Sequence, residues 1–326
     1  MPQIKETIYA PGLEGGEWIQ GGPVDLKALR GKAVVLIDFW DYTCVNCIRT
    51  LPYVVEWHRR YARHGLVVAG VHAPEFSFAR DRSHVRAAID RFGLKYPIVL
   101  DNDYAIWQAY TNRCWPAKYL ADGEGRLRYY HFGEGQYQET EAQIQRLLGE
   151  LDPALDFPPP VAPVRDSDQP GALCYRVTPE LYLGYARGQF GNPAGVGHDR
   201  DQDYADPGRH AEGAAYLRGR WTVGKESARA EEEGAALSLR YTGMDVNLVL
   251  APPEGKAARI ELILSEGQRP GADVKAGNGR AIVTVDEPRM YSLIANESVS
   301  QGSLELRAID PGFAAFAFTF VSCVID

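Results

Sequence analysis

The chain has 326 residues, a net charge of −8 and 45% hydrophobic residues, an ordinary composition for a globular protein. This length favours two domains, and the negative charge disfavours nucleic acid or an anionic membrane surface as a partner. The sequence has no run of about 18 apolar residues and begins without the basic and apolar stretches of a signal peptide. We therefore expect no membrane span and a cytoplasmic location.

The beginning of the chain is rich in turns. Glycines and prolines separate two short strand-like pieces near residues 8–9 and 18–19. Residues 24–32 then lead into residues 34–37, a continuous apolar run with β-branched residues that predicts a buried parallel strand. Beyond this strand, apolar residues recur at helical spacing from Ile48 to Tyr61.

A Cys-x-x-Cys pair, Cys44 and Cys47, falls where this strand runs into the first turn of the helix. The unpaired N–H groups and the dipole of a helix N-terminus favour a thiolate, although the dipole alone lowers a pKa by at most about 1.5. With help from the second thiol and from nearby N–H groups, we expect the pKa of Cys44 to lie between roughly 3.5 and 7.5. Cys44 is then the nucleophile and Cys47, one turn deeper, the resolving cysteine.

Other uses of this pair are weaker hypotheses. Two cysteines make half of a tetrahedral zinc site, and no second Cys-x-x-Cys or His-x-x-x-His pair occurs in the sequence. An inert structural pair is the remaining alternative. We expect redox chemistry, with no metal and no cofactor beyond the Cys44–Cys47 disulfide itself.

The rest of the first half alternates between strands and helices. The hydrophobic pattern predicts strands over residues 66–71 and 96–100 and a hairpin of residues 118–120 and 127–131. It predicts helices near residues 80–91, 104–110 and 139–148. This alternation indicates an α/β sheet with helices on both faces.

The motif around the cysteines resembles that of thioredoxins. The shared features are Asp38 six residues before the first cysteine, the Phe39-Trp40 pair, the Cys-x-x-Cys pair, and Pro52 five residues after the second cysteine. The lead-in over residues 24–32 resembles the TlpA-like and peroxiredoxin-like branch of this superfamily. The helix near residues 80–91 looks like the insertion that the TlpA-like branch carries.

The resemblance to thioredoxins implies roles for further residues. It places Asp38 beneath Cys47, where a buried carboxylate has a raised pKa and accepts a proton. It also places a cis-proline, Pro116 after Trp115, against the dithiol, where the backbone pairs with a substrate chain. Cys114 is a candidate third redox thiol, and a small buried residue is the alternative. Glu75 follows the second strand at the same sheet edge as Cys44 and is a candidate for tuning the site, with a solvated loop as the alternative.

Peroxidase activity belongs to the same branch and requires its own motif. Peroxiredoxins have Thr or Ser three residues before the reactive cysteine and Pro seven before it. This sequence has Asp41 and Ile37 at those positions. The sequence therefore disfavours a peroxidase.

The second half has a different character. Residues 156–163 are rich in proline and predict a stiff, extended linker. Beyond it, alternating apolar segments separated by turns predict an all-β sandwich or jelly roll. We therefore expect a thioredoxin-like redox domain over residues 1–155, a linker over residues 156–169 and a β-sandwich over residues 170–326.

Two stretches of the second half, residues 178–184 and 311–320, resemble the C-terminal half of DipZ-type proteins. In that family a thioredoxin-like domain is followed by a β-sandwich similar to carbohydrate-binding modules. The segments 72–76 and 112–117 agree with the family, as does the Tyr-Thr-Cys-Val-Asn-Cys site, which makes Tyr42 and Thr43 candidate site residues. DipZ proteins carry an N-terminal membrane domain that delivers electrons, and we expect this chain to lack one.

These features predict a thiol-disulfide oxidoreductase that acts on protein disulfides and receives electrons from an unidentified donor. The alternative is a binding module in which the β-sandwich recognises a glycan or a protein and the dithiol is a redox sensor. Aromatic residues of the second half could form a sugar-stacking platform, although ordinary packing explains them better: Tyr182, Tyr185, Tyr216 and Trp221.

Two further features of the second half have ordinary structural explanations. Residues 198–206 space carboxylates like a calcium loop, but Tyr204 replaces the turn glycine and no bidentate Glu follows, which favours a solvated acidic loop. Cys174 and Cys323 lie in the first and last strands of this half. We expect both to be free thiols in a reducing compartment, with a disulfide between them as the alternative.

Overall fold

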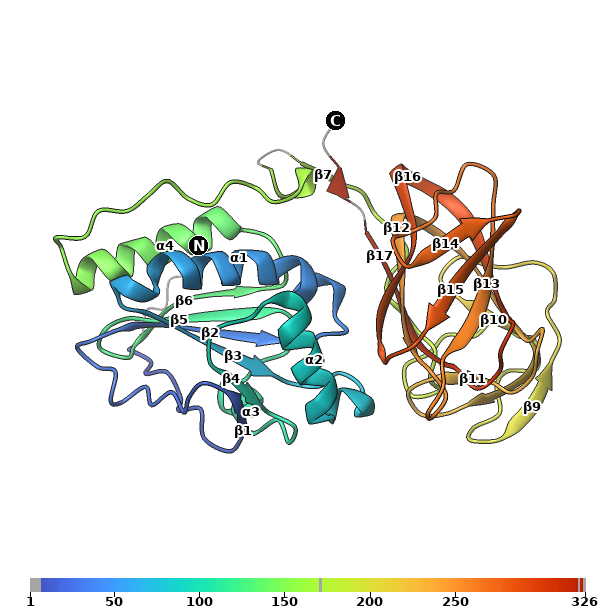
Figure 1. Cartoon of the computed structure of the whole chain (residues 1–326), viewed down its shortest axis with the longest axis horizontal. Helices are drawn as coiled ribbons and strands as arrows, with labels where there is room; N and C mark the ends of the chain where they lie inside the picture. Colours follow the sequence, from blue (N-terminus) through green and yellow to red (C-terminus); the bar gives the residue numbers. More distant parts are fainter. Residues whose placement is uncertain (1–6, 170–171, 322, 325–326) are drawn as a thin grey trace. The chain divides into compact units, whose positions relative to one another are not determined.

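The computed structural model describes residues 7–169, 172–321 and 323–324, and only the backbone of residues 173–174 and 323–324. The chain forms two compact units, Met1–Asp168 and Gln169–Asp326 (Figure 1). Among the described residues, no helix combines the length and the apolar character needed to cross a membrane.

The first unit is built on a six-stranded sheet with the strand order β1-β4-β3-β2-β5-β6. The central strands β2, β3 and β4 run parallel, and β1, β5 and β6 join antiparallel. The strands are β1 (Glu17–Gln20), β2 (Val34–Trp40), β3 (Leu66–His72), β4 (Ile98–Leu100), β5 (Ala117–Ala121) and β6 (Leu127–Phe132).

Helices cover both faces of this sheet, as predicted. Helices α1 (Val45–Tyr61), α2 (Arg82–Phe92) and α4 (Tyr137–Leu151) pack on one core, and α3 (Ala105–Ala109) packs on the other core together with the lead-in. Short 3-10 turns occur at Ala62–His64, Ser77–Arg80 and Asp166–Asp168. The strand–helix alternation of a thioredoxin fold is confirmed.

A buried carboxylate ties α1 to α4. Glu141 of α4 accepts hydrogen bonds from the Trp57 indole N–H at 3.1 Å and the Tyr61 hydroxyl at 2.6 Å, both on the buried side of α1. Pro52 lies inside α1 on an exposed position, so the apolar stripe of the helix continues past it. The helix that carries the dithiol is thus fixed at its C-terminal end.

The segment predicted as a linker follows the surface of the first unit. The Val161 amide donates to the Glu141 carboxylate, and the Val164 amide donates to the Tyr53 hydroxyl, both at 2.7 Å. Arg165 donates to the Arg49 carbonyl at 2.6 Å. Residues 161–168, called the strap below, therefore belong to the first unit and contact both α1 and α4.

The second unit is all-β in its described residues, as predicted. Ten strands form one antiparallel sheet in the order β14-β15-β13-β16-β12-β10-β11-β17-β8, with β9 beside β10. Its strands are β8 (Leu181–Tyr182), β9 (Asp201–Tyr204), β10 (Ala215–Val223), β11 (Ala228–Ala230), β12 (Ala236–Ala251), β13 (Ala258–Leu264), β14 (Val274–Gly277), β15 (Arg280–Val285), β16 (Arg289–Ala308) and β17 (Ala314–Phe320).

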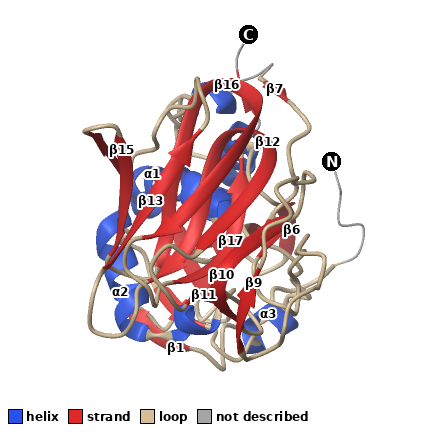
Figure 2. Ribbon diagram, turned by 90° about the vertical axis from the view of Figure 1, so that its right-hand side faces the viewer, coloured by secondary structure: helices blue, strands red, loops and turns tan. Residues whose placement is uncertain are grey.

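The long strand β12 makes this sheet curl on itself. Its first half pairs with β10 and its second half with β17, while β16 follows it along most of its length. Figure 2 shows these long strands running side by side. They enclose a single core that includes the fully buried rings of Trp221, Tyr241 and Tyr291.

A separate pair of short strands, β7 (Leu173–Cys174) and β18 (Cys323–Val324), places Cys174 opposite Cys323 in backbone register. The side chains of both cysteines lie outside the described residues. The expectation that they are free thiols therefore stays a prediction.

Candidate dithiol site

The dithiol site lies at the carboxyl end of the central strand β2. All seven of its residues are buried between β3 and β5, and the chain leaves it at Trp40 to enter α1 at Val45. The four residues between them, Asp41 to Cys44, form the loop that sets the position of the dithiol.

Asp41 holds this loop together. One oxygen of its buried carboxylate accepts hydrogen bonds from the Thr43 amide and the Thr43 hydroxyl, both at 2.6 Å. The other oxygen accepts from the Glu75 amide at 2.8 Å, in the loop after β3. Asp41 thus joins the two loops at this sheet edge, a role that the sequence analysis missed because it weighed Asp41 only against the peroxidase motif.

Cys44 is the N-cap residue of α1. Its Sγ accepts a hydrogen bond from the Cys47 amide at 3.2 Å, as the oxygen of a capping serine would. Cys44 is partly exposed, whereas Cys47 is buried. Cys44, Cys47 and Cys114 are free thiols, so the structure presents the reduced dithiol.

The prediction that the pKa of Cys44 is lowered is wrong. Burial raises its pKa, and the carboxylates of Glu75 and Asp41 raise it further, while the hydrogen bonds from Cys47 lower it. Burial raises the pKa of Cys47 well above its ordinary value, so Cys44 is the thiol that ionises first.

Asp38 lies in the middle of the buried sheet. Burial raises its pKa to about 7, and the positive charge of Lys118 acts in the opposite direction. Neither oxygen of its carboxylate has a hydrogen-bond partner among the described residues. A carboxyl group with this pKa can exchange a proton near neutral pH.

Lys118 is a second buried charged residue beside Asp38 that the sequence analysis missed. It lies directly opposite Asp38 in the β2–β5 register, and its side chain is fully buried. A signal was available, because lysine is almost never fully buried and this one lies between apolar residues of a predicted strand.

The loop before β5 contributes Trp115 and Pro116, which are joined by a cis peptide bond. The Trp115 indole N–H donates to the Ala73 carbonyl at 2.9 Å. The ring centroids of Trp115 and Trp107 lie 4.4 Å apart. The thiol of Cys114 is half-buried, and burial raises its pKa.

Tyr42 and His72 fill the space behind the loop. Their rings stack with centroids 5.7 Å apart, and His72 Nε2 lies 3.8 Å from the Asp41 carboxylate. Burial lowers the pKa of His72 to about 3, so this histidine is neutral at physiological pH. Of the candidate residues, Tyr42 and Thr43 thus lie in the dithiol loop, and Glu75 is joined to it through Asp41.

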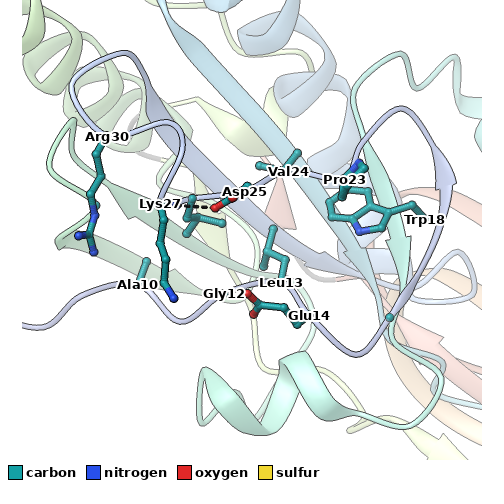
Figure 3. A pocket seen from close by; sticks show the side chains of 13 residues that line it. Ala10, Gly12, Leu13, Glu14, Trp18, Pro23, Val24, Asp25, Lys27 and Arg30 are labelled. Carbon is teal, nitrogen blue, oxygen red and sulfur yellow. Dashed lines mark hydrogen bonds between the residues drawn. The ribbon is translucent and has the colours of Figure 1, made fainter.

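A cavity of about 280 Å³ lies in the lead-in of the first unit, lined in part by Leu13, Trp18, Lys27 and Arg30 (Figure 3). None of the residues predicted for the dithiol site lines it. Its walls come from the segment before β2 and from the turn at Gly125.

The aromatic residues singled out in the second unit are engaged within the chain. Trp221 and Tyr216 are buried. The Arg187 guanidinium lies 3.7 Å from the Tyr182 ring centroid, and His198 stacks on Tyr185 at 4.1 Å. Core packing accounts for Trp221 and Tyr216, whereas Tyr182 and Tyr185 are partly exposed and contact Arg187 and His198.

Three of the four carboxylates of the acidic loop have partners within the chain. Asp199 accepts from the Tyr185 hydroxyl at 2.9 Å, and Asp201 pairs with Arg220. Asp206 pairs with His210 at 2.8 Å. No cluster of three or more His, Cys, Asp or Glu side chains suited to a metal ion occurs in the part of the chain that the structure describes.

Comparisons with known proteins agree with this architecture. Residues 10–130 match the AhpC/TSA family, and residues 178–320 match the thioredoxin like C-terminal domain. The chain is 35% identical over 324 residues to protein DipZ of Mycobacterium bovis, an alignment that covers 98% of this chain and 44% of DipZ. The chain thus spans less than half the length of that relative.

Two further comparisons concern the first unit. Over 142 residues the chain is 30% identical to the thiol-disulfide oxidoreductase YkuV of Bacillus subtilis. The alignment covers 44% of this chain and 95% of YkuV. The solution structure of a thioredoxin-like protein in the oxidized form shares 29% sequence identity with this chain. Its superposition covers 45% of this chain and 99% of the other, with a TM-score of 0.41. The chain belongs to the thioredoxin superfamily, with a thioredoxin-like AhpC/TSA domain followed by a thioredoxin like C-terminal domain.

Proposed function

We propose that this protein is a thiol-disulfide oxidoreductase that reduces protein disulfides through Cys44 and Cys47. The observation that carries the proposal is the position of Cys44 as a partly exposed helix cap whose Sγ accepts the amide hydrogen of the buried Cys47. Relatives described as thiol-disulfide oxidoreductases support it.

The first step is attack by the Cys44 thiolate on a substrate disulfide. A bond forms between Cys44 Sγ and one substrate sulfur, the substrate S–S bond breaks, and the departing thiolate takes a proton from water. The cis-proline loop at Trp115 and Pro116 is proposed to pair with the substrate backbone.

The second step resolves this mixed disulfide. Cys47 gives its proton to Asp38, and its thiolate attacks Cys44 Sγ and displaces the second substrate thiolate. The substrate disulfide has then become two thiols, and the Cys44–Cys47 dithiol has become a disulfide. A dithiol donor must supply two electrons and two protons to restore it.

The surroundings of Cys44 favour the reducing direction. Strong oxidants of this superfamily stabilise their reduced thiolate, which gives potentials near about −120 mV, compared with about −270 mV for thioredoxin. Glu75 and Asp41 place negative charge near Cys44 and destabilise its thiolate. We therefore expect a potential nearer to that of thioredoxin.

The partner of the second unit and the location of the protein stay predictions. A glycan or protein ligand and a cytoplasmic location are the expectations carried over from the sequence. The binding-module alternative remains testable because it requires no turnover at the dithiol.

The test is insulin disulfide reduction by the full chain, with dithiothreitol as electron donor. We expect turnover that is lost in Cys44→Ser. Wild-type protein that gives no rate above dithiothreitol alone would overturn the proposal in favour of the binding module. Hydrogen peroxide consumption exceeding insulin turnover would instead indicate a peroxidase.

A further inference from the structure

The ammonium group of Lys118 is buried within the first unit with few partners. Its Nζ donates to the Gly133 carbonyl at 3.2 Å and lies 5.9 Å from the Tyr137 ring centroid. The strand register places it directly opposite Asp38. A buried cation is unfavourable unless a nearby negative charge compensates it.

Four acidic groups act electrostatically on Lys118: Asp38, Cys47, Cys114 and Glu134. Asp38 lies opposite Lys118 on β2, Cys47 belongs to α1, and Cys114 lies in the loop before β5. Glu134, in the loop after β6, is held by Arg49 at 3.2 Å. Two more groups bear on this pair: His131, opposite Lys118 in the β5–β6 register, and Tyr96, whose pKa is raised by burial and by the charge of Asp38.

This arrangement matters for the resolving step of the proposed function. Before the step, the negative charge is on Asp38, and after it the charge is on the Cys47 sulfur. A cation whose charge acts on both groups compensates the negative charge in either position. Proton transfer then leaves no unpaired charge in the buried sheet, where such a charge is strongly unfavourable.

We propose that Lys118 is a positioning residue for the resolving step, whose ammonium keeps Asp38 ionised and then balances the Cys47 thiolate. The inference rests on the proposed function. It acts through Asp38 and Cys47, and Lys118 itself exchanges no proton during the step.

The pKa directions agree with this role. The charge of Lys118 opposes the burial that raises the pKa of Asp38. Burial lowers the pKa of Lys118, while the negative charges of Asp38 and Cys47 raise it. Without the ammonium group, the pKa of Asp38 would rise further, and fewer molecules would carry the carboxylate at pH 7.

The experiment adds one equivalent of the aromatic disulfide dithiobis(nitrobenzoate) to the reduced protein. It measures the rates of the two successive releases of thionitrobenzoate. It uses the full chain with Cys114, Cys174 and Cys323 replaced by Ser, after that background is shown to reduce insulin. The first release reports attack by Cys44, and the second reports resolution by Cys47. The variants are Lys118→Met, which removes the charge, Lys118→Arg, which keeps it, and Lys95→Met, an exposed control.

We expect Lys118→Met to keep the first release and to slow the second about tenfold at pH 7, the effect of a tenfold smaller ionised fraction of Asp38. The pH profile of the second release should move to higher pH. Lys118→Arg should restore both, and Lys95→Met should match the background. A second release with unchanged rate and pH profile in Lys118→Met would overturn the inference. So would an equal loss in Lys118→Arg, because that result indicates a packing role.

A measurement without mutation covers the case in which Lys118→Met does not fold. Nitrogen NMR of the Lys118 Nζ in the wild-type protein should show a charged ammonium throughout pH 6–8. A neutral amine in that range would overturn the inference. Failure of the proposed function is distinguishable, because the background protein would then not reduce insulin, whatever its reaction with the aromatic disulfide.

Discussion

The Cys47 amide donates a hydrogen bond to Cys44 Sγ at 3.2 Å, so the cysteine proposed to resolve the mixed disulfide also supports the proposed nucleophile. Such a bond is stronger when the acceptor is an anion, and it offsets part of the effect of burial on the pKa of Cys44. The carboxylates of Glu75 and Asp41 act in the opposite direction. The reactivity of Cys44 is therefore a balance that single substitutions can shift.

Glu75→Gln should make Cys44 more reactive. The substitution removes a negative charge that raises the pKa of Cys44 and keeps the Glu75 amide that binds Asp41. We expect Cys44 to react with iodoacetamide about two- to fivefold faster near pH 7, the size of effect typical of a partly solvated charge. The redox potential should become less negative. An unchanged alkylation rate would show that Glu75 exerts no field at the thiol.

Asp41→Asn should destabilise the dithiol loop. Its carboxylate accepts three hydrogen bonds in a buried position, and an amide would turn its NH2 group toward at least one of these donors. We expect the free energy of unfolding in urea to fall by about 2–4 kcal/mol. Thr43→Val is the matched control, since it removes only the hydroxyl donor and should lower stability by about 1 kcal/mol. Equal stability of wild type and Asp41→Asn would contradict this account of the loop.

Asp38→Asn should change how stability depends on pH. The pKa of Asp38 is about 7 in the folded protein, compared with about 3.9 in an unfolded chain. Between these values the folded protein holds a proton that the unfolded chain has lost, so the wild-type free energy of unfolding falls as pH rises from about 4 to about 7.

The Asp38→Asn variant has no titrating carboxyl group at this position, so its free energy of unfolding does not fall in this way. Its stability relative to wild type should therefore grow by on the order of 4 kcal/mol between pH 4 and pH 8. Urea unfolding at several pH values measures the difference, with the exposed Asp90→Asn as a control that follows wild type. Parallel stability curves for Asp38→Asn and wild type would mean that Asp38 is not titrating in this range.

Residues 161–168 should be needed for full stability of the first unit. A fragment ending at Leu155 loses the hydrogen bonds that the Val161 and Val164 amides make to Glu141 and Tyr53. We expect it to be about 2–4 kcal/mol less stable than a fragment ending at Asp168. Thermal unfolding of the two fragments compares them directly. If both melt at the same temperature, the strap only lies on the surface.

The sequence was informative where local patterns decide the structure. The apolar run before Asp38 and the helical spacing after Ile48 predict the strand–helix junction that holds the dithiol, and both elements are present. Alternating segments in the second half likewise predict its all-β character. Such patterns reflect which side of an element is buried, and that information is local.

The sequence does not show which polar residues from distant segments come together in the folded chain. Lys118 is 80 residues from Asp38, and the Val161 amide meets Glu141 only after the chain has turned back along α4. The lowered pKa expected for Cys44 failed mainly because the folded chain buries the thiol, and the charges of Glu75 and Asp41 add to that effect. Polar contacts of this kind depend on the finished topology.

The central claim is that Cys44 attacks a substrate disulfide and Cys47 resolves the product. The most direct measurement is trapping of the covalent intermediate, using mass spectrometry of the full chain after incubation with a disulfide-bonded peptide. Cys47→Ser should accumulate one peptide joined to Cys44, Cys44→Ser should form no adduct at Cys47, and wild type should end as the Cys44–Cys47 disulfide with free peptide thiols. An adduct that forms through Cys47 in Cys44→Ser, at a rate matching the one on Cys44, would contradict the assignment.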